Sequence, residues 1–193
     1  ADETICLGCL KFGMTQYPLK KLCGKITVED IGIPARAYDC LDGEHGYHRI
    51  DRHSLAAFPP KRELDAHKGT FGTVLVIAGS NSMRGAAAFA VLGALRSGAG
   101  LVKAASVSKC IDTISVLAPE ATYVEIENDS NGFMVFNDNT REKLQEQLKK
   151  STAVVIGSGM GVTDDTKEIV RFVIENSFCP VIVDADGINC IAS

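Results

Sequence analysis

The chain has 193 residues, of which 46% are hydrophobic, so it is long enough for one domain with an appendage and too apolar to be a disordered segment. Its formal net charge of −4 argues against a nucleic-acid-binding surface, which requires clustered Lys and Arg side chains. The sequence contains no apolar run of about 18 residues, so no membrane span is expected.

The cysteine content indicates a reducing compartment. Seven cysteines, an odd number in a chain that is not a small secreted scaffold, predict free thiols and a cytoplasmic location. Zinc is the alternative, because four cysteines cluster near the N-terminus, although the second pair is badly spaced for a zinc ribbon: Cys6, Cys9, Cys23 and Cys40. The histidines share one polar stretch, which we interpret as a solvated linker rather than a metal site: His45, His48, His53 and His67.

The first 66 residues differ in composition from the rest. Residues 1–35 predict a strand, a turn and a second strand, because residues 25–30 alternate polar and apolar side chains before Pro34. Residues 36–66 are mixed and polar, and the Pro59-Pro60 pair breaks regular structure, so we interpret them as a linker and lead-in. The N-terminus has neither an initiator Met nor the features of a signal peptide, so we expect upstream sequence to be missing.

Residues 67–193 show a regular alternation of strands and helices. Five apolar runs predict strands at 73–78, 101–105, 122–126, 153–157 and 181–184. Between them, helical spacing predicts a helix that buries Ala88, Val91, Leu92 and Leu95, and another over 108–117. Two more helices are expected, one capped by Asn139 or Thr140 and one capped by Thr163. This order predicts an α/β fold with three αβα layers and a mostly parallel sheet, preceded by a short β segment.

Ligands of such sheets bind beyond the carboxyl ends of the strands. Residues 79–87 join a strand to a helix through small side chains, and their free amides suit an anion, although a tight structural turn is an equal alternative. Residues 157–161 contain three alternating glycines in a similar position. Residues 184–189 place two carboxylates and an amide at one strand end, where a helix N-cap at Asp186 is the alternative. Pro119-Glu120 is interpreted as a turn.

These segments together resemble the NAD(P)H-hydrate dehydratase family, which has a ribokinase-like fold. The resemblance is carried by residues 68–80, Gly85-Ala86, residues 94–102, Pro119-Glu120, and the segments 157–161 and 184–189, which follow the family's order. Three departures are mild: Ala87 replaces a Pro, Ser158-Gly159-Met160-Gly161 replaces Pro-Gly-Leu-Gly, and Gly187-Ile188 replaces Ala-Leu. The family's Gly-Thr-Gly-Asp motif, which carries its catalytic aspartate, has no counterpart in these residues, so no catalytic residue is assigned and we expect the chain to be truncated.

The head of the chain resembles the end of an NAD(P)H-hydrate epimerase domain. The match lies in residues 1–4, 11–13, 17–18 and 24–34. In bifunctional members of the family, that domain precedes the dehydratase. The resemblance therefore implies an epimerase-like tail at 1–35, a linker at 36–66, and the N-terminal part of a dehydratase domain at 67–193.

The resemblance implies repair of NADH or NADPH that has been hydrated on the nicotinamide ring. ADP or ATP, with Mg²⁺, would phosphorylate the ring hydroxyl, because phosphate leaves more readily than hydroxide. The resemblance implies a substrate site made of Ala86, Gly159, Gly161, Asp184 and Asn189, at which a side chain on Gly161 would intrude on the ligand. The expected partners are small-molecule nucleotides and further copies of the intact protein, with no nucleic acid or membrane among them.

Two other functions stay open. One is a ribokinase-like kinase of a small alcohol, against which residues 69–102 argue. The other is a non-catalytic nucleotide-binding module. Turnover of hydrated NADH separates the first alternative from repair, and nucleotide binding without turnover would support the second.

Overall fold

A computed structural model describes residues 1–38, 50, 52–56 and 62–192. The chain divides into two compact units, Ala1–Lys61 and Arg62–Ser193. Within the described residues, no helix has both the length and the apolar character needed to cross a membrane.

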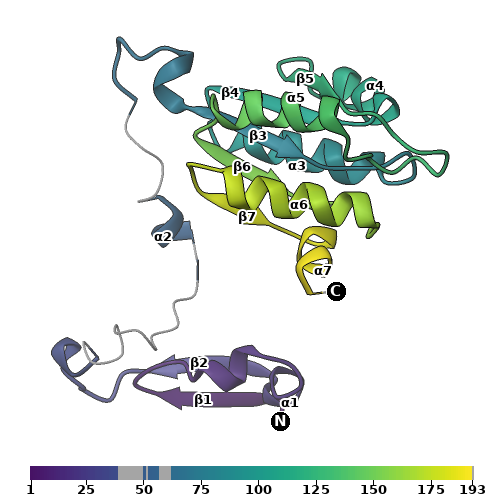
Figure 1. The fold of residues 1–193 in the computed structure, drawn as a ribbon. Helices are drawn as coiled ribbons and strands as arrows, with labels where there is room; N and C mark the ends of the chain where they lie inside the picture. The colour runs from purple at the N-terminus through teal and green to yellow at the C-terminus, as the bar shows by residue number, and fades with distance from the viewer. Residues whose placement is uncertain (39–49, 51, 57–61, 193) are drawn as a thin grey trace. The chain divides into compact units, whose positions relative to one another are not determined.

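The first unit contains a pair of parallel strands. Strand β1 (Glu3–Leu7) pairs with β2 (Lys25–Glu29), and the short helix α1 (Lys20–Cys23) lies between them in sequence (Figure 1). A second short helix, α2, covers Arg52–Ala56. The predicted β segment is therefore present, and its two strands run in the same direction.

Two of the described cysteines of this unit, Cys6 and Cys23, have hydrogen-bond partners other than cysteine. The thiol of Cys6 donates to the sulfur of Met14 at 3.2 Å, and the thiol of Cys23 donates to the Leu19 carbonyl at 3.3 Å. Among the residues that the structure describes, no group of three or more His, Cys, Asp or Glu side chains is arranged to hold a metal ion. Cys40, His45 and His48, on which the metal alternatives depend, lie outside those residues.

The second unit is built on a five-stranded parallel sheet with the order β5-β4-β3-β6-β7. In chain order the strands are β3 (Thr73–Ile77), β4 (Leu101–Ser106), β5 (Thr122–Glu125), β6 (Ala153–Ile156) and β7 (Val181–Val183). Leu75 and Ile77 on β3 and Val154 and Ile156 on β6 are fully buried, as expected for central strands covered on both faces.

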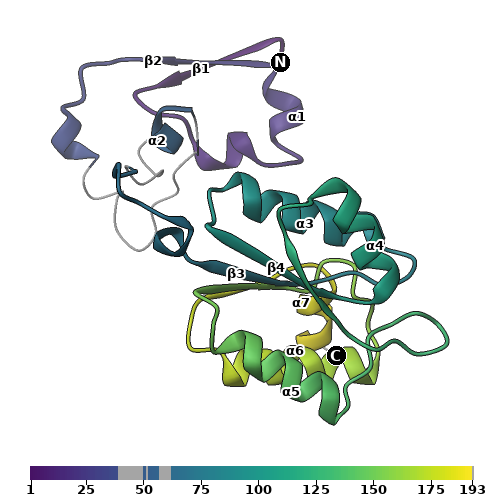
Figure 2. The ribbon, with the colours of Figure 1, turned by 90° about the horizontal axis from the view of Figure 1, so that it is seen from above.

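Helices cover both faces of this sheet. Helices α3 (Arg84–Arg96) and α4 (Ser108–Leu117) pack together on one face, and α5 (Asp138–Leu148) and α6 (Asp164–Asn176) lie on the other (Figure 2). A short helix, α7 (Asp186–Ala192), follows β7 and packs against α6. The predicted three-layer αβα architecture is confirmed.

One predicted helix cap is wrong and another is confirmed. Asn137, rather than Asn139 or Thr140, caps α5, and its side-chain oxygen accepts a hydrogen bond from the Thr140 amide at 2.9 Å. The side chain of Asn139 instead donates to Glu127, and the buried Thr140 hydroxyl donates to the Val135 carbonyl. Thr163 caps α6 as predicted, in a capping box with Thr166.

The strand order places a topological switch between β3 and β6. From β3 the chain passes to β4 and β5 on one side, and then crosses to β6 and β7 on the other. The connections that follow β3 and β6 therefore diverge to opposite sides. In open sheets of this type, ligands bind beyond the carboxyl ends of the strands at such a point.

Candidate functional site

The loops that follow β3 and β6 meet at this switch. The Gly79 amide donates to the Ser158 carbonyl at 2.9 Å, and the Gly157 amide donates to the Ile77 carbonyl at 3.1 Å. A Cβ atom added to Gly159 would lie 2.8 Å from the Cβ atoms of both Ala86 and Met83. Two of the predicted site residues, Ala86 and Gly159, are thus brought into direct proximity, and only a glycine permits that approach.

The beginning of α3 presents backbone donors at this point. Its N-cap is Met83, whose side chain makes no capping hydrogen bond. Gly85 has open space where a Cβ atom would lie, so the first turn is approachable. The amides of a first helical turn have no partners within the helix, and together with the helix dipole they favour an anion.

The loop between β3 and α3 contains a buried acceptor. Among the described residues, the side-chain oxygen of Asn81 is buried and has no hydrogen-bond partner. The Asn81 carbonyl accepts from Nε of Arg84 at 2.9 Å, which fixes this loop against the beginning of α3. Because buried polar groups are almost always paired, such an atom marks a place for water or a ligand.

Gly161, another predicted substrate contact, has hydrogen-bond partners within the chain for both of its backbone polar groups. Its amide donates to Oδ2 of Asp186 at 2.9 Å, and its carbonyl accepts from the Thr166 hydroxyl at 3.0 Å. A Cβ atom at Gly161 would lie 2.3 Å from Cε1 of Phe133. A side chain there would therefore meet Phe133 even without a ligand, and the Gly161 amide already has an acceptor.

The remaining predicted residues lie around the start of α7. Asp184 and Asn189 are exposed. Oδ2 of Asp184 accepts from the Ser158 hydroxyl at 2.9 Å, and the side-chain nitrogen of Asn189 donates to Oδ1 of Asp186 at 3.5 Å. Ala185 has a φ of +47°, a left-handed conformation that is unfavourable for a non-glycine residue. The two carboxylates thus hold the loop after β6, and Asp186 is the first residue of α7 rather than its N-cap.

A turn between β5 and α5 completes the site and was not identified from the sequence. The Asn81 amide donates to the Gly132 carbonyl at 2.9 Å, and the next residue, Phe133, packs against Gly161. Oδ1 of Asp129 accepts from the amides of Asn131 and Phe133 and so shapes the turn. The Asn131-Gly132 dipeptide is a turn signal that predicts this feature, but not where the turn packs. Pro119-Glu120 forms a turn, as interpreted from the sequence.

Beneath the loop after β3 lies a buried thiol. Cys110 donates to the Ser80 carbonyl at 3.2 Å. Burial raises the pKa of this thiol, although the Ser106 hydroxyl and the charge of Arg84 act in the opposite direction. A buried thiol with a raised pKa is inert, so Cys110 supports the loop by packing.

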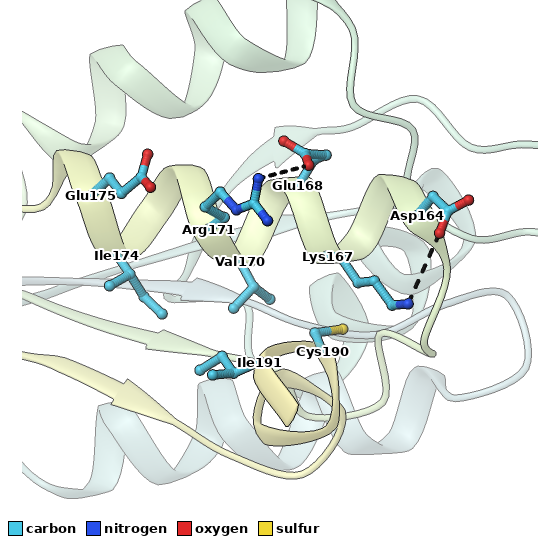
Figure 3. A pocket seen from close by; sticks show the side chains of 9 residues that line it. All are labelled: Asp164, Lys167, Glu168, Val170, Arg171, Ile174, Glu175, Cys190 and Ile191. Atoms are coloured by element: carbon cyan, nitrogen blue, oxygen red, sulfur yellow. Dashed lines mark hydrogen bonds and ion pairs between the residues drawn. The ribbon is translucent and has the colours of Figure 1, made fainter. Parts of the chain in front are cut away.

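A pocket of about 400 Å³ lies elsewhere, between α6 and α7 (Figure 3). Its rim carries charged side chains that pair along α6: Lys167 with Asp164 at 3.9 Å, and Arg171 with Glu168 at 3.4 Å. Its lining includes Cys190 but none of the five predicted site residues. The pocket is therefore not lined by the loop residues that meet at the switch, although Cys190 contacts the Gly161 carbonyl.

Comparisons with known proteins agree with this fold. A family model described as NAD(P)H-hydrate dehydratase matches residues 74–193. A ribokinase-like superfamily protein from Enterococcus faecalis superposes with a TM-score of 0.64 at 21% identity, over 74% of this chain and 47% of that one. This likeness supports the fold alone.

Relatives at higher identity agree with the family match. The ADP/ATP-dependent NAD(P)H-hydrate dehydratase of Bacillus subtilis, co-crystallised with ATP and Mg²⁺, is 33% identical with a TM-score of 0.55, over 70% of this chain and 44% of that one. A bifunctional NAD(P)H-hydrate repair enzyme from Thermofilum pendens is 29% identical over 100% of this chain and 35% of its own length. The chain thus spans less than half the length of these relatives. On the family match over residues 74–193, the chain belongs to the NAD(P)H-hydrate dehydratase family.

Proposed function

We propose that this chain carries part of the substrate site of an enzyme that converts hydrated NADH or NADPH back to NADH or NADPH, with ADP or ATP as phosphoryl donor. The observation that carries the proposal is the meeting of Ala86, in the first turn of α3, with Gly159, in the loop after β6. This contact lies at the switch of the sheet and within the residues that match the family.

Each predicted residue has a proposed role that fits its surroundings. The amides at the start of α3 bind a phosphate or pyrophosphate, for which the uncapped first turn is suited. Gly159 lets the loop after β6 approach the start of α3, and Gly161 shapes the loop. Asp184 and Asn189 are exposed and offer oxygen atoms for a ribose hydroxyl or for Mg²⁺. The buried Asn81 oxygen adds an acceptor for a bound water or ligand.

The proposed reaction needs more than this site. Transfer of a phosphoryl group to the ring hydroxyl requires a base and preorganised donors that neutralise phosphate charge. A base contributes about 10²–10⁴-fold, and the anion-stabilising donors a comparable factor. The family's Gly-Thr-Gly-Asp motif supplies these groups by resemblance and is absent from residues 1–193, so we propose that these residues bind the substrate without turning it over.

The experiment measures binding and turnover separately. Purified residues 1–193 are titrated calorimetrically with hydrated NADH, and with NADH as the comparison ligand. Hydrated NADH is then incubated with ADP or ATP and Mg²⁺ while the return of NADH absorbance is followed, and a panel of small alcohols with ATP tests the kinase alternative. Binding of hydrated NADH without turnover supports the proposal. Phosphorylation of an alcohol, or no affinity for hydrated NADH, refutes it.

A matched pair of variants locates the site. Ala86→Asp places a negative charge in the first turn of α3, where it repels a phosphate, so we expect at least about tenfold weaker binding. Ser115→Asp adds the same charge to the exposed surface of α4 and should bind as the wild type does. Circular dichroism melting of both variants separates lost binding from lost folding.

We further propose that residues 1–35 are the tail of an epimerase-like domain and that residues 36–66 are the linker and lead-in to the dehydratase residues. Bifunctional relatives match 100% of the chain, whereas the dehydratases of Listeria monocytogenes and Bacillus subtilis match 75% and 67% of it. Parallel strands are normally covered on both faces, yet Ile5 and Leu7 of β1 are 60% and 56% exposed. Expression with an upstream epimerase domain should protect these two residues from hydroxyl-radical labelling.

We also propose a cellular location and an oligomeric state for the intact protein. Among the described residues the cysteines form no disulfide bond, which suits a reducing compartment such as the cytoplasm. The intact protein is proposed to be a homo-oligomer, with exposed apolar side chains such as Phe89 and Val116 as contact candidates. Analytical ultracentrifugation of the intact protein tests the assembly.

A further inference from the structure

The Gly161 peptide is held from both sides by groups that lie on other elements. Asp186, at the start of α7, accepts from the Gly161 amide at 2.9 Å. The Thr166 hydroxyl on α6 donates to the Gly161 carbonyl at 3.0 Å, and the Cys190 thiol on α7 lies 3.8 Å from the same oxygen. Residues 157–161 form a loop that we call the glycine loop. Its end is therefore fixed relative to α6 and α7.

The Asp186 carboxylate is itself fixed by its backbone. The preceding Ala185 has a φ of +47°, and the amides of Ile188 and Asn189 both donate to the Ala185 carbonyl. A Cβ atom on Gly157 would lie 2.0 Å from the Asp184 carbonyl oxygen, so the start of the glycine loop runs in contact with this segment. A strained conformation maintained by such contacts typically marks a functional position.

The glycine loop needs an external restraint. Gly157, Gly159 and Gly161 all have positive φ values, of 123°, 70° and 75°. Glycine backbones lose more conformational freedom on folding than others, so this loop has many alternative conformations. Its middle residue is the one that lies against Ala86.

We propose that Asp186 is a positioning residue: its carboxylate holds Gly161, and thereby keeps Gly159 against Ala86 in the arrangement that receives the hydrated nicotinamide nucleotide. The inference rests on the proposed function and deepens it, because it assigns a role in substrate binding to a side chain that need not touch the substrate. The acceptor oxygen is the essential property, so asparagine should replace the aspartate and alanine should not.

The test compares Asp186→Ala, Asp186→Asn and a control, Asp112→Ala, which removes one exposed carboxylate from α4. Backbone amide exchange in residues 1–193 is measured by NMR without ligand. We expect the Gly161 amide to exchange about tenfold faster or more in Asp186→Ala, because a charge-assisted hydrogen bond is lost. Asp186→Asn should exchange close to the wild-type rate, and Asp112→Ala should match the wild type.

The second readout is the calorimetric affinity for hydrated NADH. Asp186→Ala should bind about tenfold more weakly, with most of the affinity restored in Asp186→Asn, while urea unfolding midpoints report global stability. Equal acceleration of the Gly161 amide and of the α6 core amides would assign Asp186 to stability alone and overturn the inference. Local acceleration with unchanged affinity would also overturn it. A wild-type chain with no affinity for hydrated NADH would instead refute the proposed function, and the positioning role with it.

Discussion

Substitution of Gly161 by alanine tests how this structure holds its glycine loop. Gly161 has a φ of +75°, and a Cβ atom there would lie 2.3 Å from Cε1 and 2.6 Å from Cδ1 of Phe133. The left-handed conformation costs a non-glycine residue about 1–2 kcal/mol. Displacing the ring by more than an ångström costs about 1–3 kcal/mol, as for other overpacked sites. We therefore expect Gly161→Ala to lower the free energy of unfolding by about 2–5 kcal/mol.

The two contributions are separable with a double-mutant cycle. In Gly161→Ala/Phe133→Ala the ring is absent, so only the backbone cost of the new residue remains, and the cycle should give a coupling energy of about 1–3 kcal/mol. Urea unfolding, followed by circular dichroism, measures each variant. Gly85→Ala is the control, because that helical glycine has open space at its Cβ position and should gain up to about 1 kcal/mol. Strict additivity of the two substitutions would refute the proposed contact.

Three further predictions concern stability and reactivity. Thr163→Ala removes the capping box of α6 and should lower the free energy of unfolding by about 1 kcal/mol, whereas Thr163→Ser should not; urea unfolding of both variants decides this. Hydrogen bonds from Asn139 and then Asn137, together with the charge of Lys143, hold the pKa of the Glu127 carboxyl below its ordinary value of 4.5. A carboxyl whose pKa is lower in the folded state stabilises the fold above its unfolded pKa, and this contribution is lost as the pH falls through the folded pKa. The urea midpoint of the wild type should therefore fall with acidification more than that of Glu127→Gln, and parallel curves would contradict the prediction. Burial raises the pKa of the Cys110 thiol, so mass spectrometry after iodoacetamide treatment at neutral pH should find it alkylated at least about tenfold more slowly than Cys9; similar rates would show that the thiol is accessible.

The order of the elements was predictable because it depends on local patterns. Apolar runs such as residues 73–78 and 153–157 are typical of strands covered on both faces, and their alternation with helices predicts mostly parallel pairing. The Thr163 cap was identified for the same reason, since a capping box is encoded within four residues. The α5 cap lies two to three residues before the predicted positions, because several polar residues compete there and the contacts of Glu127 from outside the helix decide among them.

The sequence by itself determined the fold class, the family resemblance and the segments that end near the carboxyl edge of the sheet. The tertiary structure decided what those segments touch: Gly159 meets Ala86, whereas Gly161 meets Phe133 and Asp186. Phe133 comes from a turn 28 positions earlier in the chain, between β5 and α5, so no periodicity or local motif encodes this contact. Backbone conformation and helix periodicity are local properties that a sequence expresses directly, but the partner of a glycine amide depends on how distant segments pack, and that is fixed only when the sheet has formed.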